Sequence, residues 1–261
     1  MPRPYIPAWP GGLTTVPSVR KGTRMKFVTI LVSFVLVLGL AASASALPTA
    51  TEDFTTDPGW TLGGGSGGWY NSTARAGDGK EGSLTGPNGA PREYYADTDL
   101  GGTLTESDNI YASGNGYATS DEMHFGHFNT GDLSSGYPTL GLEIHGGPSA
   151  WAIIDGILSP SGVSAPWLLN KKFWWKYTYD GSTKTITVDV ADNAAYTGNA
   201  VQIVYTNAAA DFDINSFGLV VATTNGPRNG NMDNVEYTIV PEPATVAILG
   251  LGSLVLLRRR R

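Results

Sequence analysis

Apolar and polar residues alternate strictly in the second half of the chain. Over positions 173–179 every odd position is aromatic, whereas Lys176 and Thr178 between them are polar. Positions 185–190 alternate in the same way. Successive side chains of a β-strand point to opposite faces, so both stretches are predicted to be strands with one buried face. Asp180-Gly181 between them is a hairpin signal, and we expect the two strands to pair.

Shorter stretches of the same kind predict strands along the rest of the chain. They lie at 201–205, 216–221 and 234–239, and around 69–70, 93–95, 110–117, 123–128, 140–144 and 150–154. Turn residues separate them at intervals of about eight to twelve positions, which is typical of antiparallel sandwiches. The 34 glycines and 16 prolines suit many turns and do not fit a helical bundle. We therefore predict an all-β fold, an antiparallel jelly-roll β-sandwich over residues 47–239.

The N-terminal end of the chain departs from this pattern. A charged start at Met25 precedes an apolar run over 27–40, and small residues follow it up to Ala44 and Ala46. This order is typical of a secretory signal peptide, so we expect a signal helix over 25–46 with cleavage after Ala46. An uncleaved signal anchor is the alternative. Residues 1–24 fit no known signal, and we interpret them as a non-native leader from a misassigned start.

At the C-terminal end a short motif, an apolar stretch and a basic cluster follow one another. They are Pro241-Glu242-Pro243, residues 244–257, and Arg258, Arg259, Arg260 and Arg261. The apolar stretch is shorter than the roughly 20 residues of a typical transmembrane helix, although flanking arginines can extend a marginal span. A buried helix or strand is the alternative, but terminal arginines resist burial and mark the inner side of a stop-transfer segment. We expect a C-terminal hydrophobic transmembrane helix.

This order of motif, apolar stretch and arginines resembles a PEP-CTERM sorting domain, the bacterial envelope signal that an exosortase recognises. The resemblance covers residues 240–261. It implies an exosortase-type processing enzyme as a partner, processing near Pro241-Glu242-Pro243 and transient anchoring in the inner membrane. Export to the cell envelope or the extracellular space follows, often within an exopolysaccharide matrix. Such tails occur on unrelated domains, so the chemistry of the body depends on residues 47–239.

The body is strongly acidic once the two ends are set aside. Between residues 47 and 239, eight basic residues stand against 22 acidic ones, giving a formal charge of −14 compared with −6 for the whole chain. Such a charge repels the phosphates of nucleic acids and favours neutral glycans or cations as partners. The chain has no cysteine, which excludes disulfides, thiolate metal sites and a cysteine nucleophile.

Three passages of the body resemble a concanavalin-like jelly roll, the fold of laminin-G-like and lectin-like domains. They are Glu52-Asp53-Phe54 at the first strand, the aromatic hairpin 174–190, and the closing passage 232–237. The resemblance implies a scaffold that binds sugars or surfaces. We expect a structural or extracellular-matrix surface protein. The alternative is a carbohydrate-binding, lectin-like module with a polysaccharide as its partner.

A glycoside hydrolase is a more distant alternative. Glycosidases of this fold place two carboxylates on one strand face in a Glu-x-Asp-x-Glu run, because acid and nucleophile must flank one bond. The chain has no such run. Asp97-Thr98-Asp99 and Asp211-Phe212-Asp213 have the two-residue spacing, but they stand among turn residues. We therefore assign no catalytic residue and expect no enzyme activity.

Trp174 and three acidic residues are the candidates for binding. Trp174 lies on the opposite strand face from its aromatic neighbours, where an indole can stack on a sugar ring; packing between two sheets is the alternative. Calcium prefers carboxylate oxygens, and Glu52 or Asp53 can meet Asp233 where the first and last strands pair. The alternative is that Asp233 forms hydrogen bonds in a turn. No other cofactor is expected.

The chain contains three histidines, His124, His127 and His145. On one strand, His124 and His127 point to opposite faces, so a shared metal would need a bulge at Gly126. We therefore interpret the histidines as polar strand positions that face water.

Overall fold

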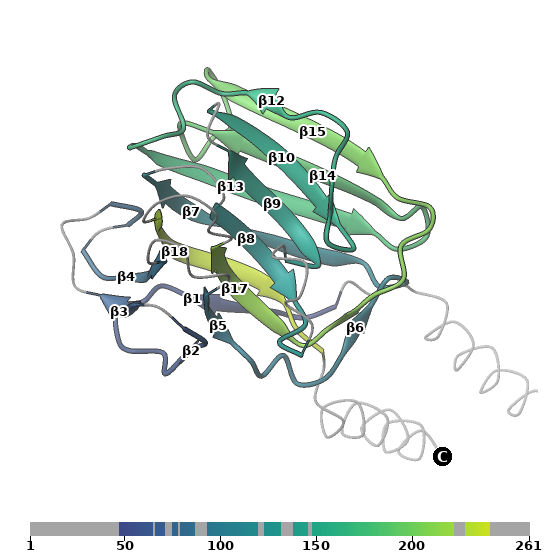
Figure 1. The fold of residues 1–261 in the computed structure, drawn as a ribbon, viewed down its shortest axis with the longest axis horizontal. Helices are drawn as coiled ribbons and strands as arrows, with labels where there is room; N and C mark the ends of the chain where they lie inside the picture. Colours follow the sequence, from purple (N-terminus) through teal and green to yellow (C-terminus); the bar gives the residue numbers. More distant parts are fainter. Residues whose placement is uncertain are drawn as a thin grey trace, which may run out of the picture. The chain divides into compact units, whose positions relative to one another are not determined.

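The computed structural model of the protein describes residues 47–64, 66–70, 75–77, 79–86, 93–119, 123–131, 138–145, 148–221 and 228–240. Within these residues the chain forms strands and turns and no α-helix. Two antiparallel sheets pack on each other in layers (Figure 1). The predicted signal peptide and the tail beyond Val240 lie outside the described residues. In the part of the chain that is described, no helix is long and apolar enough to cross a membrane.

The first layer, sheet A, contains the strands that the alternating pattern predicts most clearly. Its strands lie in the order β15-β14-β13-β7-β18-β4-β3, and β1 pairs with β18 beside this path. Their bounds are β1 Thr49–Glu52, β3 Ser66–Tyr70, β4 Glu81–Gly86, β7 Ile110–Ala118, β13 Lys172–Asp180, β14 Thr185–Ala191, β15 Ala200–Thr206 and β18 Arg228–Thr238. The first and last strands of the body therefore lie side by side, with Thr49 opposite Thr238.

The second layer, sheet B, has the order β11-β10-β9-β8-β17-β5-β2, and β12 pairs with β10. Its strands are β2 Thr61–Leu62, β5 Glu93–Asp97, β8 Met123–Phe128, β9 Leu140–His145, β10 Ser149–Ile154, β11 Ile157–Leu158, β12 Val163–Ser164 and β17 Ser216–Val221. A small third sheet pairs β6 Leu104–Thr105 with β16 Asp213–Ile214. The predicted antiparallel jelly-roll sandwich is confirmed.

The predicted aromatic hairpin forms β13 and β14 of sheet A. Its odd-numbered aromatic residues face the core and are at most 2% exposed: Phe173, Trp175, Tyr177 and Tyr179. The loop 181–184 joins the strands, and Gly181 packs so tightly that a Cβ atom would lie 2.3 Å from the backbone of Ser107. Glycine is required there by this close approach.

The core between the sheets is rich in aromatic rings. Phe217 of β17 stacks on Tyr237 of β18, with 4.3 Å between ring centroids. Phe125 of β8 and Trp175 of β13 are 5.6 Å apart. Aromatic pairs at such distances stabilise a core beyond the area that they bury. These pairs join sheet B to sheet A across the core. The even-numbered residues of β13 lie on the opposite, outer face of sheet A.

The ends of the body were predicted less well than its middle. Glu52-Asp53-Phe54 was expected to enter the first strand, but β1 ends at Glu52, and Phe54 has a φ of 53°. β1 has no alternation of large apolar residues, and backbone pairing with β18 holds it in place. β18 begins at Arg228, before the predicted start at residue 234.

A row of small residues crosses the outer face of sheet B. Gly141, Gly126, Gly218 and Ala96 are register neighbours on four adjacent strands. A Cβ atom on Gly126 would lie 2.2 Å from the carbonyl oxygen of Leu140, and Gly218 makes an equally close approach to its neighbouring strand. At Gly126, Gly141 and Gly218 the neighbouring backbone lies closer than a Cβ atom allows, so these three positions require glycine.

Candidate functional site

The outer face of sheet A is the polar side of its alternating strands. Because the odd positions of β13 face the core, Trp174, Lys176 and Thr178 face outward. Trp174 is partly exposed there, and the ammonium group of Lys172 lies over its ring, 5.0 Å from the centroid. Trp174 therefore does not pack between the two sheets. The ammonium group of Lys172 lies over its ring, where a sugar would otherwise stack.

Other aromatic rings near this face also have a cation over them. Arg75 lies over the ring of Tyr117 at 5.5 Å, and Lys176 lies over the ring of Tyr196 at 4.5 Å. Tyr111 of β7 is partly exposed and has no lysine or arginine over its ring within the described residues. Tyr111 is therefore a partly exposed, outward-facing ring of sheet A that no described cation covers, and it is the candidate for stacking on a ligand.

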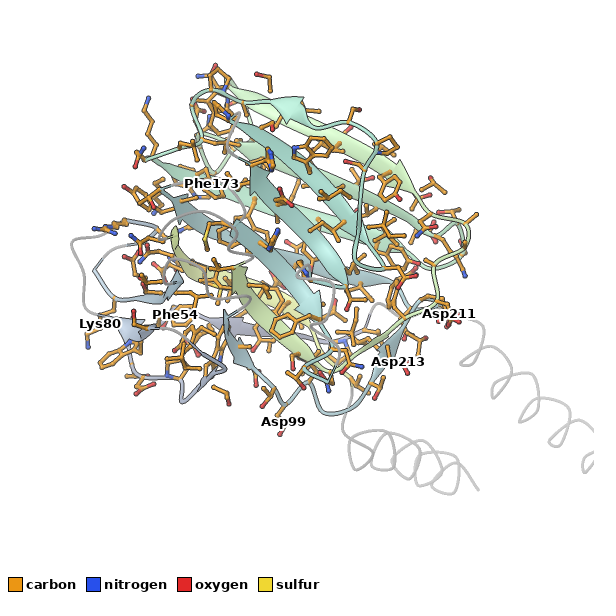
Figure 2. The ribbon with its side chains drawn as sticks, in the orientation of Figure 1. Phe54, Lys80, Asp99, Phe173, Asp211 and Asp213 are labelled. Carbon is orange, nitrogen blue, oxygen red and sulfur yellow. The ribbon has the colours of Figure 1, made fainter. Side chains whose placement is uncertain are left out.

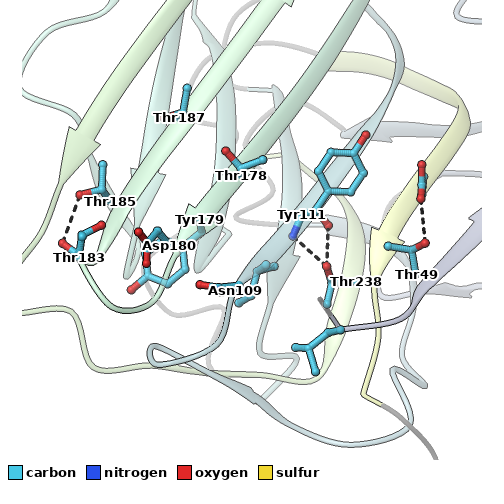
Figure 3. A pocket seen from close by; sticks show the side chains of 13 residues that line it. Thr49, Asn109, Tyr111, Thr178, Tyr179, Asp180, Thr183, Thr185, Thr187 and Thr238 are labelled. Carbon is cyan, nitrogen blue, oxygen red and sulfur yellow. Dashed lines mark hydrogen bonds between the residues drawn. The ribbon is translucent and has the colours of Figure 1, made fainter. Parts of the chain in front are cut away.

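A groove of about 640 Å³ crosses the outer face of sheet A around Tyr111 (Figure 3). Its walls come from β1, β7, β13, β14 and β18 and the loops next to them, and threonines are frequent among them. The lining residues are Leu47, Thr49, Asn109, Ile110, Tyr111, Thr178, Tyr179, Asp180, Thr183, Thr185, Thr187, Glu236 and Thr238. A groove with one aromatic wall and many hydroxyls is the kind of concave site in which polar ligands bind.

Strand register brings these residues into one row. Thr187 of β14 lies opposite Thr178 of β13, and Thr178 lies opposite Tyr111 of β7. Thr238 of β18 continues the row, because its Oγ1 accepts a hydrogen bond from the backbone N–H of Tyr111 at 2.8 Å. The same hydroxyl donates to the carbonyl oxygen of Tyr111 at 3.1 Å. Thr238 is thus committed to the sheet, whereas its neighbours in the row face the groove.

Several hydroxyls of the groove are available to a ligand. Within the described residues the side-chain hydroxyls of Tyr111, Thr178 and Thr187 have no hydrogen-bond partner, whereas Thr185 shares a bond of 2.7 Å with Thr206. A hydroxyl can donate one hydrogen bond and accept others. The groove therefore offers one open ring and a set of donors and acceptors beside it.

The residues predicted to bind calcium form local hydrogen bonds. The backbone N–H of Phe54 donates to Glu52 at 2.6 Å, and Thr55 donates to Asp53 from both its N–H and its hydroxyl. Asp233 is fully buried and accepts two bonds from Asn234, at 2.8 and 2.9 Å. No group of three or more acidic, histidine or cysteine side chains suited to a metal occurs among the described residues. Calcium binding at these positions stays a prediction.

The histidines on β8 do point to opposite faces, but the prediction that they face water is wrong. His124 and His127 are both fully buried. On the outer face of sheet B, Glu143 accepts hydrogen bonds from His124 at 3.0 Å and from the half-exposed His145 at 2.6 Å. Burial by itself would raise the pKa of Glu143, but these two imidazoles outweigh it and lower that pKa. His124 and His127 can be buried because each imidazole has a hydrogen-bond partner.

The paired aspartates occupy turns and the ends of strands, as their surroundings predict. Asp97 accepts hydrogen bonds from the hydroxyl of Tyr237 at 2.6 Å and from the backbone N–H of Asp99 at 3.0 Å. Asp99, Asp211 and Asp213 are exposed and lie toward one edge of the sandwich in the view of Figure 2. None of these carboxylates lines the groove of sheet A.

Comparison with known families identifies the C-terminal tail. Residues 240–261 match the model of the PEP-CTERM protein-sorting motif. The tail is a PEP-CTERM sorting motif. Such a motif implies export and transient anchoring through the C-terminal region, in agreement with the resemblance of Pro241-Glu242-Pro243 and the terminal arginines. No curated protein matches the chain in sequence.

Solved structures identify the fold of the body. Lectin II from Ulex europaeus superposes with a TM-score of 0.53 at 12% identity, covering 76% of this chain and 100% of that one. The body has the legume-lectin-like jelly-roll fold. A Bauhinia forficata lectin in complex with GalNAc gives a TM-score of 0.51 at 10% identity, over 76% of this chain and 100% of that one. Basic winged bean lectin with Tn-antigen gives a TM-score of 0.51 at 10% identity, over 73% of this chain and 97% of that one.

The sequence did not reveal Tyr111, Thr178 and Thr187 as residues of a candidate site. Each is a polar or aromatic residue at an outward position of a strand, and such residues are common on any sheet surface. One local feature of the sequence could have favoured Tyr111 over Trp174 as the stacking residue. Lys172 stands two positions before Trp174, on the same strand face, where its ammonium group reaches the indole.

Proposed function

We propose that the protein is exported, processed at its PEP-CTERM tail, and binds carbohydrate through the groove of sheet A. The observation that carries this proposal is the open ring of Tyr111 beside the unpartnered hydroxyls of Thr178 and Thr187. A sugar has an apolar ring face and a rim of hydroxyls, which match a phenol ring and a row of threonines. The lectin-like fold and the galactose, GalNAc and Tn-antigen named for its structural neighbours support the same class of ligand.

The test is a glycan array probed with the mature secreted protein, followed by titration of the glycans that bind. Tyr111→Ala should weaken binding by about tenfold or more, because the loss of a stacking contact of about 1.4 kcal/mol changes affinity tenfold. Trp174→Ala is the matched control on the same face. It should leave binding within about twofold, since Lys172 already lies over its ring.

A structural role in the extracellular matrix, our first expectation from the sequence, predicts a different result. The mature protein would then bind no glycan, and Tyr111→Ala would have no effect. The proposal also requires binding without turnover. Release of reducing ends from any bound polysaccharide would contradict the expectation that the body is not an enzyme.

A further inference from the structure

The charge of the groove restricts the class of sugar that it suits. Among the described residues, its two charged lining side chains are Asp180 and Glu236, and no lysine, arginine or histidine of that part of the chain lines it. Nearby lysines are occupied elsewhere: Lys176 lies 3.6 Å from Asp189, and Lys184 donates to the carbonyl oxygen of Ala210. The ion pairs within the described residues involve neither groove carboxylate. Cleavage after Ala46 would place the α-ammonium group of Leu47, which also lines the groove, beside these two carboxylates. The groove therefore presents an excess of negative charge to its ligand.

In each of the two carboxylates, one oxygen atom accepts the hydrogen bonds that hold the side chain in place. Asp180 Oδ1 accepts from the hydroxyl of Ser182 at 2.7 Å and from its backbone N–H at 2.9 Å. These bonds lower the pKa of Asp180, so it is ionised at neutral pH. Glu236 Oε1 accepts from the hydroxyl of Thr49 at 2.8 Å. Each side chain has a fixed direction at the groove surface.

The two carboxylates lie on either side of Tyr111. Asp180 belongs to β13 and Glu236 to β18, the two neighbours of β7, and they sit on opposite sides of the row that contains Tyr111. Strand spacing and rise place them diagonally across the groove, roughly 16 Å apart. One amine cannot reach both groups. A polymer with repeated amines can contact both while a sugar ring stacks on Tyr111.

We propose that the groove selects amine-bearing polysaccharides, that is, hexosamine polymers with free rather than acetylated amino groups. This inference rests on the proposed function and names its sugar class. Ammonium groups on successive sugars pair with Asp180 and Glu236, and the acidic body attracts a cationic polymer from a distance. Uronic acid polymers carry the wrong sign of charge, and neutral or acetylated glycans gain nothing from the two carboxylates.

The experiment is calorimetric titration of the mature protein with three hexasaccharides at pH 6: glucosamine, N-acetylglucosamine and a uronic acid. We expect the glucosamine hexamer to bind about tenfold more tightly than the acetylated one, a difference of about 1.4 kcal/mol. The double variant Asp180→Asn, Glu236→Gln should lose this preference and keep its affinity for the acetylated hexamer. Asp57→Asn, an exposed carboxylate outside the groove, is the control for general charge and should keep the preference.

The outcomes separate the two proposals. Equal affinity for the acetylated and free hexamers, both weakened by Tyr111→Ala, would overturn amine selection and leave carbohydrate binding in place. An amine preference that survives the double variant, or that Asp57→Asn reduces as much, would overturn the assignment to Asp180 and Glu236. A failure to bind any of the hexamers or any glycan of the array would overturn the proposed function itself. Disaccharides should show little preference, because they cannot reach both carboxylates.

Discussion

The phenol of Tyr177 donates a hydrogen bond to Nδ1 of His127 across the interior of the sandwich, with 2.5 Å between Oη and Nδ1. The backbone carbonyl of Thr238 can only accept, so Nε2 of the same imidazole donates to it at 3.1 Å. A neutral His127 satisfies both bonds. One buried imidazole therefore connects β8 of sheet B to β13 and β18 of sheet A.

This buried imidazole predicts a loss of stability in mild acid. Burial lowers the pKa of His127 to about 4, whereas histidine in an unfolded chain titrates near 6.5. Between these values the unfolded chain binds a proton that the folded protein does not, so the free energy of unfolding falls as the pH falls through this window. The contribution of the neutral, buried His127 to the free energy of unfolding is fully present above about pH 6.5, and it is reduced by roughly 2 kcal/mol at pH 5.

Urea denaturation at pH 7 and pH 5 measures this difference. The variant His127→Gln keeps a donor and an acceptor but cannot titrate. Between pH 7 and pH 5 its free energy of unfolding should therefore fall by roughly 2 kcal/mol less than that of the native protein. The comparison removes the effect of all other groups that titrate in both proteins. Equal losses in the two proteins would show that His127 does not cause the acid sensitivity.

Removing the phenol hydroxyl of Tyr177 should destabilise the protein at neutral pH. Tyr177→Phe leaves Nδ1 of a fully buried imidazole without its donor, which costs about 1–3 kcal/mol. Tyr205→Phe is a suitable control, because the hydroxyl of this partly exposed residue has no partner within the described residues. Its effect should stay within about 0.5 kcal/mol. Similar unfolding free energies for the two variants would contradict the importance of the cross-sheet bond.

The three glycines in the row of small residues on sheet B should not tolerate side chains. Gly126→Ala places a Cβ atom 2.2 Å from a backbone oxygen, so the strands must move apart, and we expect a destabilisation of about 1–3 kcal/mol or more. In Gly131→Ala the nearest atom, at 3.2 Å, belongs to the side chain of Asn129, and the effect should be about 0.5 kcal/mol or less. Thermal denaturation of both variants tests this, and equal melting temperatures would refute the close packing of the row.

The fold was predictable where sequence periodicity is strict. The alternation over 173–190 gave the hairpin, its inward face and the outward direction of Trp174. The burial of His124 and His127 was not predictable, because it depends on Glu143, Tyr177 and the carbonyl of Thr238, which are distant in the sequence. A histidine on a strand looks the same in the sequence whether it faces water or a buried partner.

The groove was hidden from the sequence for a related reason. It takes residues from five strands, and only the register of β1, β18, β7, β13 and β14 brings them together. Tyr111 and Glu236 are far apart along the chain, and neither belongs to a motif. The tail is the opposite case, because all parts of the sorting signal are contiguous within residues 240–261.

Export and sorting predict defined ends for the mature protein. Intact-mass spectrometry of the secreted form should show a chain that begins at Leu47 and lacks Arg258 to Arg261. Replacement of Pro241-Glu242-Pro243 by three alanines should leave the arginines in place and retain the protein in the membrane fraction. Secreted protein that still carries Arg261 would contradict processing at the tail.

The most direct test of carbohydrate binding in the sheet A groove is to map the ligand contacts by NMR. Amide chemical shifts of the labelled mature protein are recorded during titration with a glucosamine hexasaccharide. We predict that the largest changes occur at Tyr111, Thr178 and Thr187 and along the strands that flank them. Changes concentrated instead on the outer face of sheet B, around His145 and Trp151, would contradict the assignment of the site.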